Sequence, residues 1–232
     1  MYGKPKKIDG AYPVTRAEAV YVADTTTLAD VMPLYGKAWL ALGDSITWGS
    51  GGTPYPVLLG DRWGMEVINK AVPGTTLCST TPITYDGDVD YITFWAGIND
   101  FKADAPPELG DMTSERVRGQ TLYGSLHYIC RSLIEAHPAA KILFMTPMRI
   151  VYKDFGESRQ ANAKGNTLED YARAIHEVCG YYGIHVLDTL RESNICPYIP
   201  AQKSAFMPDG LHPSTAGYLR MLPVIERALL GL

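Results

Sequence analysis

The sequence predicts a doubly wound α/β sandwich, in which helices cover both faces of a parallel sheet. Five short apolar runs of strand length occur along the chain, and segments with helical periodicity lie between them. Strands that alternate with helices form parallel sheets, because the connection between two parallel strands has to cross a face of the sheet. At 232 residues, 46% hydrophobic and 20% charged, the chain suits one such domain with a sizeable core.

The predicted strands are short and rich in β-branched, aromatic and aliphatic residues. Continuous apolar runs of this kind are typical of parallel strands that are buried on both faces. The five runs are Trp39–Leu42, Glu66–Asn69, Tyr91–Trp95, Ile142–Met145 and Ile184–Leu187. We therefore expect a five-stranded parallel sheet.

Two helices are predicted between the later strands. In the segment Thr113–His137, apolar residues recur at helical spacing, at Leu122, Leu126, Ile129, Cys130 and Leu133. A second helix is expected to begin at Asn166, which can act as an N-cap with Glu169 as the acidic residue three positions later. Gly183 would end this helix.

The two ends of the chain differ in character. A helical pattern covers about Ser214–Leu230, and Pro223 within it is expected to kink or split the helix. Residues 1–36 do not fit the repeating unit, so we interpret them as an N-terminal arm and residues 37–232 as the domain. The arm would lie on the domain surface, or it would support a homo-oligomer or attachment to a larger assembly.

Charge and composition argue against several classes of protein. The net charge of −4 and a pI near 5.7 give no attraction for nucleic acid. No apolar stretch reaches the ~20 residues of a membrane span, and the segment after Met1 lacks the apolar core of a signal peptide. We expect a soluble protein without membrane contacts, cytoplasmic or released by a route that needs no signal peptide. The four cysteines are expected to be free thiols, and no motif indicates a metal or a cofactor.

A serine, a carboxylate and an imidazole stand out as candidate catalytic groups. Ser45 follows Gly43 and Asp44 directly after the first apolar run, and Asp209 precedes His212 by three residues near the C-terminus. A serine hydroxyl becomes a nucleophile when an imidazole takes its proton, and a carboxylate orients that imidazole and stabilises its cation. Ser45, His212 and Asp209 together could hydrolyse an ester.

Two further motifs follow predicted strands. Asn69–Gly74 comes after the second apolar run, and Gly97–Asp100 comes after the third. In open α/β sheets, ligands bind beyond the carboxyl ends of the strands, which is where Ser45, Gly74 and Asn99 all fall. We expect these motifs to form one site.

The four motifs, in this order, resemble those of the SGNH hydrolases, the GDSL family of serine esterases and lipases, over roughly Lys37 to Leu232. The resemblance implies a flavodoxin-like three-layer α/β/α sandwich with a five-stranded parallel sheet, the SGNH hydrolase fold. It also implies that Ser45 is the nucleophile, with His212 and Asp209 completing the triad. The oxyanion hole would consist of the backbone N–H groups of Ser45 and Gly74 and the side-chain amide of Asn99.

One position departs from the family pattern, because Ala71 replaces the middle glycine of the second motif. We expect this to affect the packing of the loop more than the chemistry. The other common serine-hydrolase architecture fits less well, since its nucleophile motif reads Gly-x-Ser-x-Gly and Ser45 is followed by Ile46 and Thr47.

The substrate is less well defined by the sequence. We expect a small-molecule or carbohydrate ester, with a short acyl or acetyl group and no cofactor. Three long connections could frame its pocket, at residues 75–90, 101–112 and 147–165. The alternative is a glycan-binding module on the same fold, attached to a larger assembly by the N-terminal arm.

Overall fold

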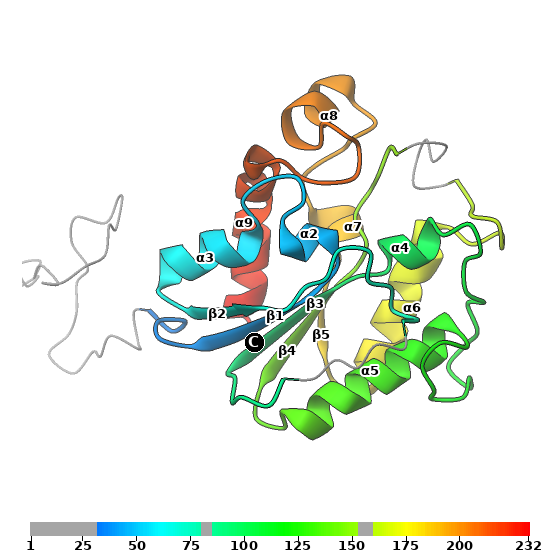
Figure 1. The fold of residues 1–232 in the computed structure, drawn as a ribbon, viewed down its shortest axis with the longest axis horizontal. Helices are drawn as coiled ribbons and strands as arrows, with labels where there is room; N and C mark the ends of the chain where they lie inside the picture. Colours follow the sequence, from blue (N-terminus) through cyan, green and yellow to red (C-terminus); the bar gives the residue numbers. More distant parts are fainter. Residues whose placement is uncertain (1–31, 80–84, 153–159) are drawn as a thin grey trace, which may run out of the picture.

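A computed structural model describes residues 32–79, 85–152 and 160–232, and its centre is a five-stranded parallel sheet (Figure 1). The strand order is β2-β1-β3-β4-β5, and every neighbouring pair is parallel. The strands are β1 (Ala38–Gly43), β2 (Glu66–Asn69), β3 (Tyr91–Trp95), β4 (Lys141–Met145) and β5 (His185–Leu187). The predicted sheet is therefore confirmed, with bounds within a residue of the apolar runs.

Helices cover both faces of this sheet, which confirms the three-layer sandwich. In Figure 1, α3 and α9 lie on one side of the sheet, and α5 and α6 lie on the other. The helices are α2 (Ser45–Trp48), α3 (Tyr55–Trp63), α4 (Ile98–Phe101), α5 (Leu122–Ala136), α6 (Leu168–Tyr181), α7 (Thr189–Glu192), α8 (Pro200–Phe206) and α9 (Thr215–Leu230).

One of the two predicted helices starts later than expected. In the segment Thr113–His137 the helix begins at Leu122, the first apolar residue of the predicted pattern, because the Thr121 side chain caps it by accepting a hydrogen bond from the backbone N–H of Gly124 at 3.0 Å. The second begins one residue later than expected. Thr167 is its N-cap and forms a capping box with Asp170.

The last helix runs without a break through Pro223. Ser214 caps its start by accepting a hydrogen bond from the backbone N–H of Gly217 at 3.2 Å. Of the two outcomes expected at Pro223, a kink or a split, the continuous helix excludes the split. Helix α9 buries Met221, Leu222 and Ile225 on either side of the proline, and this packing offsets the hydrogen bond that proline cannot donate.

The predicted arm of residues 1–36 lies almost entirely outside the described residues. Of its last part, Leu34 is buried in the core, and the backbone N–H of Gly36 donates to the carbonyl oxygen of Gly64 at 3.0 Å. Residues 33–36 thus pack against the domain at the start of β1.

The order of the strands positions the site. The chain passes from β1 to β2 on one side of β1, and then to β3 on its other side. Loops that leave neighbouring strands in opposite directions open a crevice at the carboxyl ends of those strands. The segments after β1, β2 and β3, which carry Ser45, Gly74 and Asn99, all start from this end of the sheet.

Candidate active site

Ser45 is the first residue of α2 and follows β1 after a single connecting residue. That residue, Asp44, caps the helix, since its Oδ1 accepts a hydrogen bond from the backbone N–H of Ile46 at 2.9 Å. The backbone N–H of Asp44 donates to the carbonyl oxygen of Trp95 at 3.1 Å, at the end of β3. The turn is thus fixed to the sheet, and it holds Ser45 at the carboxyl end of the central strands.

The structure brings together the three residues predicted to form the triad. Ser45 Oγ lies 2.9 Å from His212 Nε2, and His212 Nδ1 lies 2.7 Å from Asp209 Oδ2. The other carboxylate oxygen of Asp209 accepts hydrogen bonds from the backbone N–H groups of Leu211 at 2.8 Å and His212 at 2.7 Å. A proton on Nδ1 directed at Asp209 leaves Nε2 free to accept the serine proton.

Asp209 is held in its ionised form. Partial burial favours the neutral carboxyl, but hydrogen bonds from the backbone of His212 and Leu211 and from the His212 ring outweigh it and lower the pKa of Asp209. An ionised carboxylate beside an imidazole stabilises the imidazolium that forms when a serine gives up its proton.

The loop that carries Asp209 and His212 is fixed to the segment after β4. The backbone N–H of Val151 donates to the carbonyl oxygen of Gly210 at 2.8 Å. Gly210 has φ +78°, and a Cβ atom at this position would overlap the carbonyl oxygen of Val151. Only glycine adopts this φ without strain and also leaves room for the carbonyl oxygen of Val151. The contact between Val151 and Gly210 therefore sets the position of Asp209 relative to the sheet.

The two other predicted oxyanion donors lie at one turn. The backbone N–H of Thr75 donates to the carbonyl oxygen of Val72 at 3.0 Å and closes the turn that contains Gly74, with φ +82°. Asn99 Nδ2 donates to the carbonyl oxygen of Thr75 at 2.9 Å. A side-chain amide carries two hydrogens, so the second remains available for a ligand.

Neighbouring atoms of the described residues leave space around Gly74. A Cβ atom there would meet no described atom within 4 Å, so the positive φ favours glycine at this position. Ala71 leaves the loop attached, since its backbone N–H donates to Asn69 Oδ1 at 3.0 Å and Asn69 Nδ2 donates to the carbonyl oxygen of Thr47 at 2.9 Å.

Two buried carboxylates adjoin candidate site residues in the chain and were assigned no role from the sequence. Burial raises the pKa of Asp44 to about 7, against the opposing hydrogen bond from Ile46, and Asp44 Oδ2 has no hydrogen-bond partner among the described residues. Burial also raises the pKa of Asp100, opposed by hydrogen bonds from the backbone of Cys78 and Leu77. In the sequence both are acidic residues close to the end of a strand, Asp44 directly after β1 and Asp100 five residues after β3.

The long connections are partly described. Residues 80–84 and 153–159 of the expected pocket-framing loops lie outside the described residues. In the described part, Arg149 donates to the carbonyl oxygen of Leu190, and the Lys102 ammonium lies 5.8 Å from the centre of the Tyr152 ring. The cationic side chains of Arg149 and Lys102 therefore have partners within the protein.

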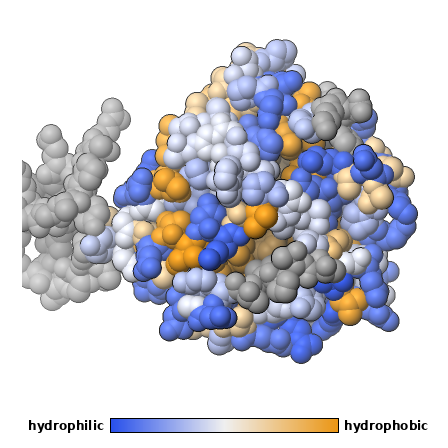
Figure 2. Space-filling view, viewed as in Figure 1, coloured by the Kyte–Doolittle hydropathy of each residue, from blue (hydrophilic) through white to orange (hydrophobic). Residues whose placement is uncertain are grey.

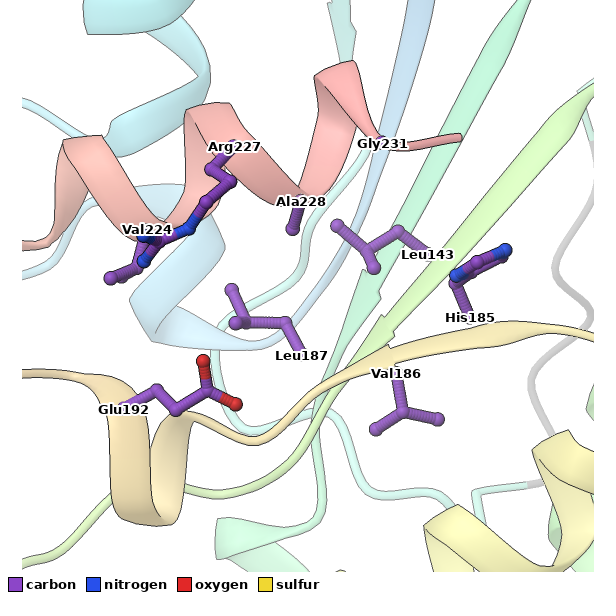
Figure 3. Close-up of a pocket in the computed structure, with 9 residues that line it drawn as sticks. All are labelled: Leu143, His185, Val186, Leu187, Glu192, Val224, Arg227, Ala228 and Gly231. Atoms are coloured by element: carbon purple, nitrogen blue, oxygen red, sulfur yellow. The ribbon is translucent and has the colours of Figure 1, made fainter.

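A cavity of about 210 Å³ lies away from Ser45, between the edge strand β5 and the last two turns of α9. Figure 3 shows Leu143 and Leu187 from the sheet facing Val224 and Ala228 from the helix, with Arg227 and Glu192 nearby. The residues that line it include none of the candidate site residues.

The described residues show no grouping of three or more His, Cys, Asp or Glu side chains that could hold a metal ion. Among the same residues, no helix has both the length and the apolar character needed to cross a bilayer. On the face shown in Figure 2, hydrophobic residues form several separate groups between hydrophilic ones.

Comparison with known proteins identifies the family. The model of the GDSL-like lipase/acylhydrolase family matches residues 41–220, which is most of the chain. The chain belongs to this family. The match covers Ser45, Gly74, Asn99 and His212, and it confirms the resemblance seen in the sequence motifs.

Solved structures share the fold of this chain. One is 30% identical with a TM-score of 0.77, and covers 86% of this chain and 98% of its own. A protein from Lactobacillus plantarum is 27% identical with a TM-score of 0.73, covering 85% and 98%. An acetyl xylan esterase from Geobacillus stearothermophilus is 20% identical with a TM-score of 0.57, covering 84% and 94%, a likeness of fold. No curated protein sequence matches the chain.

Proposed function

We propose that this member of the GDSL-like family is a serine esterase that cleaves carboxylic esters through an acyl-enzyme intermediate. The observation that carries the proposal is the line of contacts from Ser45 Oγ to His212 Nε2 at 2.9 Å and from His212 Nδ1 to Asp209 Oδ2 at 2.7 Å. Contacts of this length in this order are those that proton transfer from a serine to an imidazole requires.

In the first step, Ser45 Oγ attacks the ester carbonyl carbon while His212 Nε2 takes its proton. His212 then gives this proton to the departing alcohol, which leaves an acyl group on Ser45. Water attacks this ester by the same route, with His212 again as the base, and releases the acid.

The carbonyl oxygen becomes negatively charged in each step. The backbone N–H groups of Ser45 and Gly74 and the second amide hydrogen of Asn99 are the donors we assign to it. Loss of one such donor typically lowers the rate by about 10²–10³. The hydrogen bond from Asn99 to Thr75 supports this assignment, because it ties the Asn99 side chain to the residue that directly follows Gly74.

The substrate we favour is a short-chain or acetyl ester, such as an acetylated carbohydrate. Trp48 follows Ser45 by one helical turn and is 55% exposed, and Val72 precedes Gly74 by two residues and is 59% exposed. An exposed indole one helical turn after the nucleophile offers a flat apolar surface on which a sugar ring can pack. The fold likeness to an acetyl xylan esterase points the same way.

Hydrolysis of p-nitrophenyl acetate is the first test, followed by p-nitrophenyl esters of rising chain length and by acetylated xylan. We expect activity on the acetyl ester that falls as the acyl chain lengthens, and release of acetate from xylan. Binding of xylan without hydrolysis of any ester would instead support the glycan-binding module.

A fluorophosphonate identifies the nucleophile independently of the substrate. It should label Ser45, located by mass spectrometry, and Ser45→Ala should abolish both labelling and hydrolysis without unfolding. Ser50→Ala is the matched control, because Ser50 is an exposed serine of the same segment. Labelling at Ser50 or Ser125 would overturn the assignment.

A further inference from the structure

Asp100 is a buried carboxylate next to the candidate oxyanion donor Asn99. The residue is 1% exposed. Oδ2 accepts a hydrogen bond from the backbone N–H of Leu77 at 2.7 Å, and Oδ1 accepts one from the backbone N–H of Cys78 at 3.0 Å. Both oxygens are thus directed at one loop, more than twenty residues earlier in the chain.

That loop directly follows Gly74. Asn99 donates to the carbonyl oxygen of Thr75 at 2.9 Å, so Asn99 and Asp100 together make three hydrogen bonds to residues 75–78. On Leu77 the backbone oxygen accepts a further hydrogen bond, from Arg118 Nε at 3.2 Å. The backbone just after Gly74 is therefore fixed to α4 at three points, Thr75, Leu77 and Cys78.

Burial of this carboxylate carries a cost that a packing role alone does not explain. An apolar side chain of similar size would fill the same space without removing a charge from water. What an apolar side chain cannot do is accept hydrogen bonds from two backbone N–H groups of a loop.

We propose that Asp100 is a positioning residue for the oxyanion hole, which holds the turn of Gly74 at the distance from Ser45 that the transition state requires. The proposal rests on the proposed esterase function, and it assigns a role to a side chain that does not touch the substrate. Asn99 binds the oxyanion directly, whereas Asp100 acts through Leu77 and Cys78 on the N–H of Gly74.

Asp100→Asn is the informative variant. It keeps the shape of the side chain, but one oxygen becomes an NH₂ group that faces a backbone N–H, so one of the two hydrogen bonds is replaced by a repulsive contact. A displacement of about 1 Å at a catalytic group costs on the order of 10²-fold in rate. We expect kcat to fall about 10- to 100-fold and KM to change less than about threefold.

A trifluoromethyl ketone separates this role from a purely structural one. Its adduct with Ser45 places an oxyanion in the hole, so its inhibition constant should rise by about the same factor as kcat falls. Partial unfolding would lower the active fraction, counted by fluorophosphonate titration, without changing KM or the inhibition constant. Asp188→Asn is the control. Like Asp100, Asp188 is a buried carboxylate near the end of a strand, where it caps α7. It accepts a hydrogen bond from Thr146, and none of its hydrogen bonds reaches the segments that carry the candidate site residues.

Asp100→Glu provides a second variant if Asp100→Asn does not fold, since it keeps the charge but moves the carboxylate by one methylene. We expect the same pattern from it. A folded variant at Asp100 with the kcat and inhibition constant of the wild type would overturn the proposal. Wild-type protein without esterase activity would contradict the proposed function itself, so the two failures are distinguishable.

Discussion

Replacement of Asp44 by asparagine should make the stability of the fold less dependent on pH. The carboxyl of Asp44 is 1% exposed, and burial raises its pKa from 3.8 to about 7. In the unfolded chain the same group ionises near 3.8. The stability that the neutral carboxyl contributes is therefore fully present below the unfolded pKa, and it is lost as the pH rises through the folded pKa.

The size of the effect follows from the two pKa values. Each unit of difference corresponds to about 1.4 kcal/mol, and about two units lie between pH 5 and the folded pKa. The wild-type protein should therefore lose about 3 kcal/mol from this group between pH 5 and pH 8. The asparagine of Asp44→Asn cannot ionise, and its amide oxygen can still accept the hydrogen bond from Ile46. The difference in the free energy of unfolding between this variant and the wild type should therefore shift by about 3 kcal/mol in favour of the variant from pH 5 to pH 8.

Urea denaturation at both pH values, followed by tryptophan fluorescence, measures this difference directly. Asp111→Asn is the control. Hydrogen bonds from Thr113 lower the pKa of Asp111, so this exposed carboxylate is ionised at both pH values and its replacement should give the same difference at each. If the free energy of unfolding of Asp44→Asn differed from that of the wild type by the same amount at pH 5 and pH 8, the raised pKa of Asp44 would be refuted.

Three other predictions concern the candidate site. His212→Ala should be nearly inactive and Asp209→Asn severely impaired, with the double variant little worse than His212→Ala; additive losses in kcat/KM would mean that the two residues act separately. Asn99→Ala should lower kcat by about 10²-fold with little change in KM. A variant that is less stable by about 1 kcal/mol but keeps its kcat would contradict the assignment of Asn99 to the oxyanion hole. Gly210→Ala should be less stable and less active than Gly165→Ala, measured by melting and ester hydrolysis, because both glycines have a positive φ but only Gly210 faces a close backbone oxygen. Equal losses would show that the contact with Val151 has no role.

The central strands β1, β3 and β4 could be predicted closely because parallel strands buried on both faces appear in the sequence as apolar runs. The edge strands β2 and β5 are only partly buried, and shorter apolar runs marked them. Helix starts were less certain, because neighbouring residues compete for the cap. Asn166 and Thr167 are both good N-caps, and the structure uses Thr167 while the backbone N–H of Asn166 donates to Asn162 Oδ1 at 3.1 Å. The hydrogen bonds of the Asn166 backbone with Asn162 depend on the path of the loop, which spacing does not reveal.

The part of the candidate site that carries Ser45, Gly74 and Asn99 could be located because each of these motifs follows a strand, and parallel strands end at the same edge of the sheet. The motif of Asp209 and His212 follows α8, so only the family resemblance indicated its place in the site. The roles of Asp44 and Asp100 could not be predicted in this way. Both look like ordinary turn residues in the sequence, and their importance depends on burial and on contacts such as Asp100 with Leu77, 23 residues apart.

The contact between Ser45 and His212 joins residues that are 167 positions apart in the chain. Contacts of such separation form late, because the chain must first lose the entropy of closing a long loop. During synthesis, all five strands leave the ribosome before His212 does. The proposed ester hydrolysis should therefore appear only after His212 has reached Ser45, and its recovery during refolding would time this late step of assembly rather than the formation of the sheet.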